Sequence, residues 1–90
     1  MKINNLENWY EVTRGLYRYV VAAKVCYEIH ILYWEDGTDI LTAKSSLYIV
    51  GNRTSIPERI SFFSREILLA EQPVFECLKA AEKDYKENMQ

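Results

Sequence analysis

The sequence predicts an α+β fold: an antiparallel β-meander of three to four strands, followed by two C-terminal helices packed on one sheet face. Two observations lead to this prediction. Residues 24–50 alternate apolar and polar side chains on either side of a glycine-containing turn, which is typical of a β-hairpin. Residues 55–88 repeat apolar side chains at helical spacing. The 90 residues, 49% of them hydrophobic, suit a single domain with one core.

The N-terminal part allows two interpretations. Residues 1–8 are polar and are predicted to be a loose N-terminus. Residues 9–23 are rich in Tyr, Val, Trp and Thr, which favours two short strands with a turn at Arg14–Gly15, although a helical stripe can also be traced through them. A hairpin on its own is only marginally stable, so we favour the strands and a sheet over residues 9–50.

The register of the predicted hairpin depends on the length of its loop. A two-residue loop at residues 36–37 places Ile29 opposite Lys44, whereas a three-residue loop at residues 35–37 places Glu28 there. We favour the second register because Glu28 and Lys44 then form a cross-strand pair of opposite charge. In this register one face is almost wholly apolar, and the two helices are expected to pack on it. Its β-strand residues are Val25, Tyr27, Ile29 and Ile31.

The two C-terminal helices are predicted within residues 55–88. Ser55 can cap the free N–H groups of the first helix, Glu58 occupies the capping-box position, and proline is tolerated between them in the first turn. This helix is apolar around much of its circumference, so it should be largely buried. Pro73 ends it and suits the first turn of the last helix.

The opposite face of the hairpin is too apolar for a simple solvent-facing surface. Aromatic side chains with few charges are typical of interface cores, and such a patch is unfavourable on a free monomer. We therefore predict a contact surface for a second copy of the chain, forming a homodimer, or for another protein. The N-terminal segment, if helical, could instead cover this face. The candidate surface residues are Trp34, Tyr48, Leu32, Ile40 and His30.

No motif indicates a catalytic, metal-binding or cofactor-binding site, so we predict no enzyme activity and no cofactor. The single histidine, His30, shares a face with Cys26 and Glu28, but Cys26 and His30 lie roughly 13 Å apart along a strand, too far for direct proton transfer. Cys26 and Cys77 form no CxxC pattern and are expected to be reduced thiols. The three isolated glycines form no phosphate-binding loop.

The charge and the distribution of apolar residues narrow the range of possible partners. The net charge is −2 and no basic stretch occurs, so nucleic acid is not the favoured partner. Neither a signal peptide nor a membrane-spanning segment is recognisable, so we expect a cytoplasmic protein without a membrane partner. The prediction is a small non-catalytic protein-interaction or regulatory module that self-associates. The alternative is a single-stranded nucleic-acid binder that stacks bases on the same aromatic face.

Overall fold

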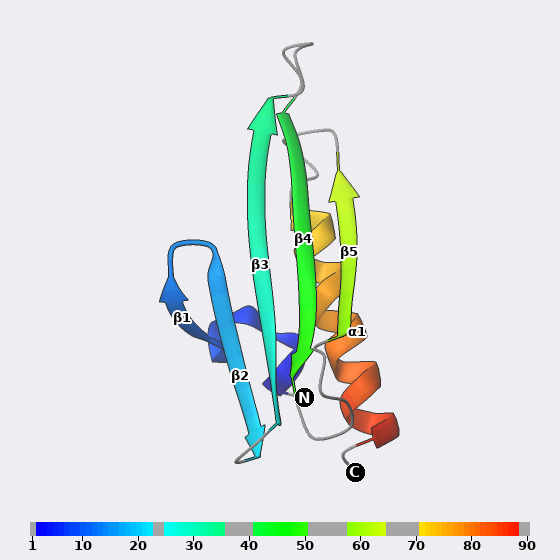
Figure 1. Cartoon of the computed structure of the whole chain (residues 1–90). Coiled ribbons are helices and arrows are strands. Elements are labelled where there is room, and N and C mark those ends of the chain that lie inside the picture. Colours follow the sequence, from blue (N-terminus) through cyan, green and yellow to red (C-terminus); the bar gives the residue numbers. More distant parts are fainter. Residues whose placement is uncertain (1, 23–24, 36–40, 51–57, 65–70, 89–90) are drawn as a thin grey trace.

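The computed structural model describes residues 2–22, 25–35, 41–50, 58–64 and 71–88. Within them, five antiparallel strands form a sheet in the order β1-β2-β3-β4-β5, and a C-terminal helix covers one face of it (Figure 1). This confirms the α+β class and the meander order, with more strands and fewer helices than predicted. The elements are η1 (Lys2–Asn4), η2 (Leu6–Asn8), β1 (Tyr10–Thr13), β2 (Leu16–Ala22), β3 (Val25–Glu35), β4 (Leu41–Val50), β5 (Glu58–Ser64) and α1 (Glu71–Asn88).

The ambiguous segment after the N-terminus folds as strands. β1 and β2 pair antiparallel across a turn at Arg14–Gly15, as the residue composition favoured. Gly15 has a φ of 82°, in the left-handed region that glycine enters without steric cost. The pairing shifts between Glu11 and Thr13, so β1 is irregular as well as short.

The hairpin of β3 and β4 forms, but the predicted register is wrong. Lys44 lies opposite Leu32 rather than Glu28, a shift of four residues along β3, and Glu35 lies opposite Leu41. The predicted turn at residues 35–37 falls largely outside the described residues. An even shift keeps every side chain on its face, so the predicted division into two faces survives. Glu28 finds its opposite charge on the other neighbouring strand, where it pairs with Arg18 at 2.7 Å.

The first predicted C-terminal helix is wrong where the structure can be described. Residues 58–64 form β5, so Glu58 begins a strand and not a capped helix, while Ser55 and Pro57 lie outside the described residues. β5 pairs along the edge of β4 from Ala43 to Ile49, and the hydroxyls of Ser46 and Ser61 are 2.8 Å apart across this pairing. The free edge of β4 therefore outweighs the local helical pattern.

The last predicted helix is confirmed as α1, which begins two residues before Pro73 and packs mainly on β4 and β5 (Figure 1). Pro73 lies in the first turn, where its missing N–H leaves no helical bond unmade. The apolar face predicted to carry the helices does face α1. The buried core between sheet, helix and N-terminus consists of Ile3, Trp9, Tyr27, Ile29, Leu47, Ile49, Cys77, Leu78 and Ala81.

The N-terminus is part of this core, so the prediction of a loose segment is wrong for residues 2–8. Ile3 is 1% exposed, and the indole Nε1 of Trp9 donates a hydrogen bond to the Ile3 carbonyl at 2.8 Å. The Trp9 ring also contacts Tyr19, with 5.5 Å between ring centroids. Since η1 contacts α1, the N-terminal segment lies on the helix side of the sheet and leaves the other face uncovered.

Candidate interaction surface

The face of the sheet that points away from α1 is called the open face below. None of the described elements lies over it (Figure 1). Side-chain alternation along paired strands assigns its members. They are Tyr10, Leu16, Arg18, Val20, Cys26, Glu28, His30, Leu32, Trp34, Thr42, Lys44, Ser46, Tyr48, Val50, Arg59, Ser61 and Phe63.

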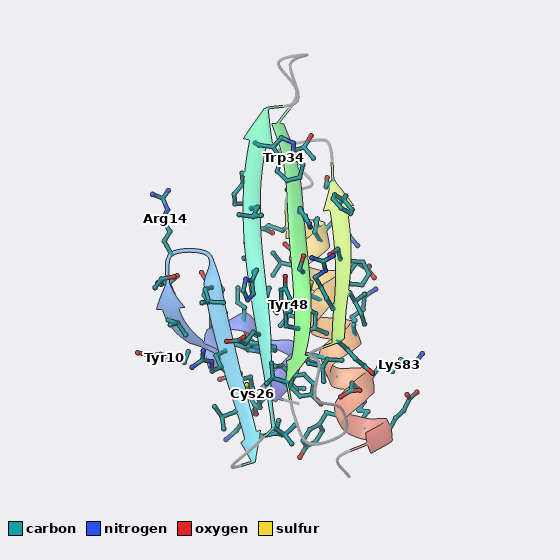
Figure 2. The ribbon with its side chains drawn as sticks, viewed as in Figure 1. Tyr10, Arg14, Cys26, Trp34, Tyr48 and Lys83 are labelled. Carbon is teal, nitrogen blue, oxygen red and sulfur yellow. The ribbon has the colours of Figure 1, made fainter. Side chains whose placement is uncertain are left out.

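Large apolar side chains are exposed at the end of the open face near the β3–β4 connection. Leu32 is 57% exposed, Trp34 is 40% exposed and Phe63 is 60% exposed. Lys44 lies between Leu32 on β3 and Phe63 on β5, and its Nζ is 5.7 Å from the centre of the Phe63 ring. Figure 2 shows Trp34 at this end of the sheet. We call these four residues, Leu32, Trp34, Lys44 and Phe63, the Trp34 patch.

The middle of the open face is more polar and better packed. The rings of His30 and Tyr48 are in contact, with centroids 4.4 Å apart and planes at 49°. The Ser46 and Ser61 hydroxyls bond to each other beside them. These side chains are buried or half-buried, so they are not a second exposed cluster beside the Trp34 patch, although the buried Nε2 of His30 has no hydrogen-bond partner among the described residues.

Four of the five residues predicted for the contact surface lie on this face. His30, Leu32 and Trp34 come from β3 and Tyr48 comes from β4, while Ile40 lies outside the described residues. Sequence reasoning missed Phe63 because residues 58–64 were read as helix. The aromatic and β-branched content of this segment was the signal that could have identified the strand.

The charges of the chain are unevenly divided between the two sides of the sheet. Among the described residues, the open face carries the basic Arg18, Lys44 and Arg59 but only one acidic side chain, Glu28. Arg18 is already paired with Glu28 through Nε and Nη2 contacts of 2.9 and 2.7 Å. Lys44 and Arg59 therefore give the open face a local positive charge on a chain of net charge −2.

A groove lies on the other side of the sheet, between the N-terminal helices, β3 and α1. Its walls include the apolar side chains of Tyr33, Phe75 and Leu78, and its rim includes Glu7 and Glu71. Tyr33 and Phe75 are 54% and 53% exposed. The end of β3 thus exposes apolar side chains on both of its faces, Leu32 and Trp34 on the open face and Tyr33 on the groove side.

The side chains considered for chemistry do not form an activated group. Burial raises the pKa of the Cys26 thiol, and Glu28 raises it further, so this thiol is protonated near neutral pH. Burial also raises the pKa of Cys77 to about 12. Within the described ranges, no three His, Cys, Asp or Glu side chains lie close enough together to bind a metal ion.

No helix in the described part of the chain has the length and apolarity needed to cross a membrane.

Comparison with known proteins adds no assignment: a scan against protein-family models and searches of curated proteins and solved structures found no match to this chain. Function is therefore argued from the surface itself.

Proposed function

We propose that this chain is a small non-catalytic protein-interaction module that self-associates through its open face. The observation that supports this is the Trp34 patch, where Leu32 and Trp34 on β3 and Phe63 on β5 expose large apolar side chains on either side of Lys44 on β4. A contiguous exposed patch of this kind on a small domain marks an interaction site more often than a surface left to water. Lys44 at its centre adds a cation that an aromatic ring or carboxylate of the partner can meet.

The exposed fractions set the expected strength of self-association. Fully burying a large apolar side chain contributes about 1.5–3 kcal/mol, and the three side chains retain roughly half of their surface for burial. Two copies together would gain about 5–9 kcal/mol, against an association cost of about 4–15 kcal/mol. The net gain is at most about 5 kcal/mol, so we expect a weak, reversible dimer that dissociates on dilution, with a dissociation constant no lower than about 0.2 mM.

Light scattering across a dilution series tests this proposal, and the chain offers a matched control. Phe63 on the open face and Phe75 on α1 are similarly exposed, and each has a lysine Nζ over its ring. Phe63→Ala removes the ring from both copies and should raise the dissociation constant by at least about tenfold, whereas Phe75→Ala should leave it unchanged. A wild-type protein that stays monomeric at every concentration, or equal effects of both substitutions, would contradict the proposal.

A second candidate function is the binding of single-stranded nucleic acid on the same face. Its support is the position of Lys44 and Arg59 among Trp34, Tyr48 and Phe63, since base stacking on aromatic rings combines with phosphate contacts in such binders. Fluorescence anisotropy with a labelled oligonucleotide should then show binding that weakens steeply with salt and is lost in Lys44→Ala. Absence of binding at low salt would remove this candidate.

A further inference from the structure

β3 extends beyond its neighbour β2 at the end that carries Trp34. Pairing with β2 ends where Leu16 meets His30, and one further backbone hydrogen bond joins the Ile31 N–H to the Gly15 carbonyl at 2.8 Å. On its other side β3 remains paired with β4 as far as Glu35. Figure 1 shows β3 and β4 continuing past the β1–β2 turn. Within the described residues, Leu32–Glu35 is thus paired on one side only; we call it the overhang.

The direction of the free backbone groups follows from strand alternation. The Ile31 N–H points toward β2, so the N–H and C=O groups of Tyr33 and Glu35 point to the same side, beyond the end of β2. The corresponding groups of Leu32 and Trp34 point toward β4. The overhang therefore presents a short row of backbone donors and acceptors to a strand that would lie beside it.

The overhang is as short as β1, but its pairing with β4 is regular and three of its four residues carry no charge. Edge strands are commonly short, irregular or charged. β1 has four residues and a shift in its pairing, and β5 begins with the exposed charges of Glu58 and Arg59. Residues 32–34 of the overhang are instead Leu, Tyr and Trp, which are uncharged, suit a strand and are exposed.

We infer that the overhang is a strand-addition site, and that its occupant is the same overhang of a second copy of this chain, paired antiparallel. This inference rests on the proposed self-association and adds a second contact to it, at the edge of β3 beside the open face. A hollow with Arg14, Tyr17 and Tyr33 in its lining lies between the β1–β2 turn and the start of the overhang.

Self-complementarity is the reason for choosing a second copy. An antiparallel pair has two-fold symmetry, so each overhang meets the same backbone groups that it offers. With the axis at Trp34, Glu35 lies opposite the uncharged Tyr33 of the second copy, so no two residues of like charge are paired within residues 33–35. A two-fold axis at Trp34 pairs Tyr33 with Glu35 of the second copy and leaves the Ile31–Gly15 hydrogen bond intact. The two Trp34 side chains then lie opposite each other, and the two Trp34 patches form one continuous surface.

A pair of substitutions at Tyr33 separates backbone pairing from side-chain contact. Tyr33→Pro removes the outward N–H, which β4 does not use, whereas Tyr33→Ala removes the ring and keeps the N–H. Light scattering should show a dissociation constant at least about tenfold higher for Tyr33→Pro than for Tyr33→Ala. Circular dichroism and urea unfolding at low concentration verify that both variants fold.

Hydrogen exchange of the wild-type protein tests the same inference without any substitution. The Tyr33 and Glu35 amides should exchange more slowly as the protein concentration rises, while other exposed amides should not. A dimer that Tyr33→Pro leaves intact, with concentration-independent exchange at these amides, overturns the inference while self-association through the patch stands. A monomer at every concentration overturns both. Protection that arises only when an unrelated extended peptide is added overturns the choice of a second copy.

Discussion

Gly15 at the β1–β2 turn is a position where one added methyl group should weaken the whole fold. Its φ of 82° costs an alanine about 1–2 kcal/mol. The new Cβ would also lie 2.9 Å from the backbone oxygen of Ile31, an atom that cannot move without disturbing β3. Relieving this contact would open the turn and weaken the Ile31–Gly15 hydrogen bond, worth about 1 kcal/mol. Gly15→Ala should therefore cost about 2–3 kcal/mol.

Urea unfolding at one low protein concentration, followed by the fluorescence of the buried Trp9, measures this cost. With a slope of about 1–1.5 kcal/mol per molar urea, the midpoint should fall by about 2 M. Gly15→Asn adds the same Cβ, but asparagine tolerates the left-handed region better, so it should lose about 1 kcal/mol less. A loss below about 0.5 kcal/mol for Gly15→Ala would refute the reasoning, because neither the backbone angle nor the close contact would then matter.

Three further predictions concern the core. The Tyr27 hydroxyl donates to Asp84 Oδ2 at 2.6 Å, so Tyr27→Phe should cost about 1–3 kcal/mol in urea unfolding. Burial raises the pKa of the Cys77 thiol to about 12 in the folded protein, so the unfolded chain loses the thiol proton at lower pH. The free energy of unfolding should therefore fall as the pH rises from about 9 toward 12. Cys77→Ala should reduce the slope of this fall by up to about 1.4 kcal/mol per pH unit. Trp9→Phe leaves the Ile3 carbonyl without its 2.8 Å donor, and thermal unfolding should show a loss of about 2 kcal/mol.

The two faces of the central hairpin could be predicted from sequence, but its register could not. Alternation with period two places Tyr27 and Ile29 on the helix side and His30 and Trp34 on the other, whatever the loop length, provided that the shift is even. The register was inferred from one favourable charge pair between two strands. In the structure Glu28 is paired with Arg18 on β2, a third strand. The sequence of the β3–β4 hairpin alone does not reveal this partner.

The error over residues 58–64 has a similar cause. Ile60, Phe62 and Phe63 fit a buried helix stripe as well as a strand, so the local pattern did not decide between them. The decision comes from β4, whose free edge needs a partner and is far away in sequence. The same error left Phe63 out of the predicted contact surface, whereas His30, Leu32, Trp34 and Tyr48 share one face of the sheet, as the alternation predicted.

The shared core of the N-terminus and the last helix has a consequence during synthesis. Ile3 and Cys77 belong to the same buried cluster, so the core on this face of the sheet cannot be completed until α1 has left the ribosome. At about 5–20 residues per second, roughly 4–15 s pass between the synthesis of the two. Once they have been synthesised, Tyr27, Ile29 and Leu47 lack the helix that covers them until α1 follows. We therefore expect nascent chains to expose this apolar sheet face until residues 71–88 have been synthesised, and slower translation of this stretch to lower the yield of folded protein.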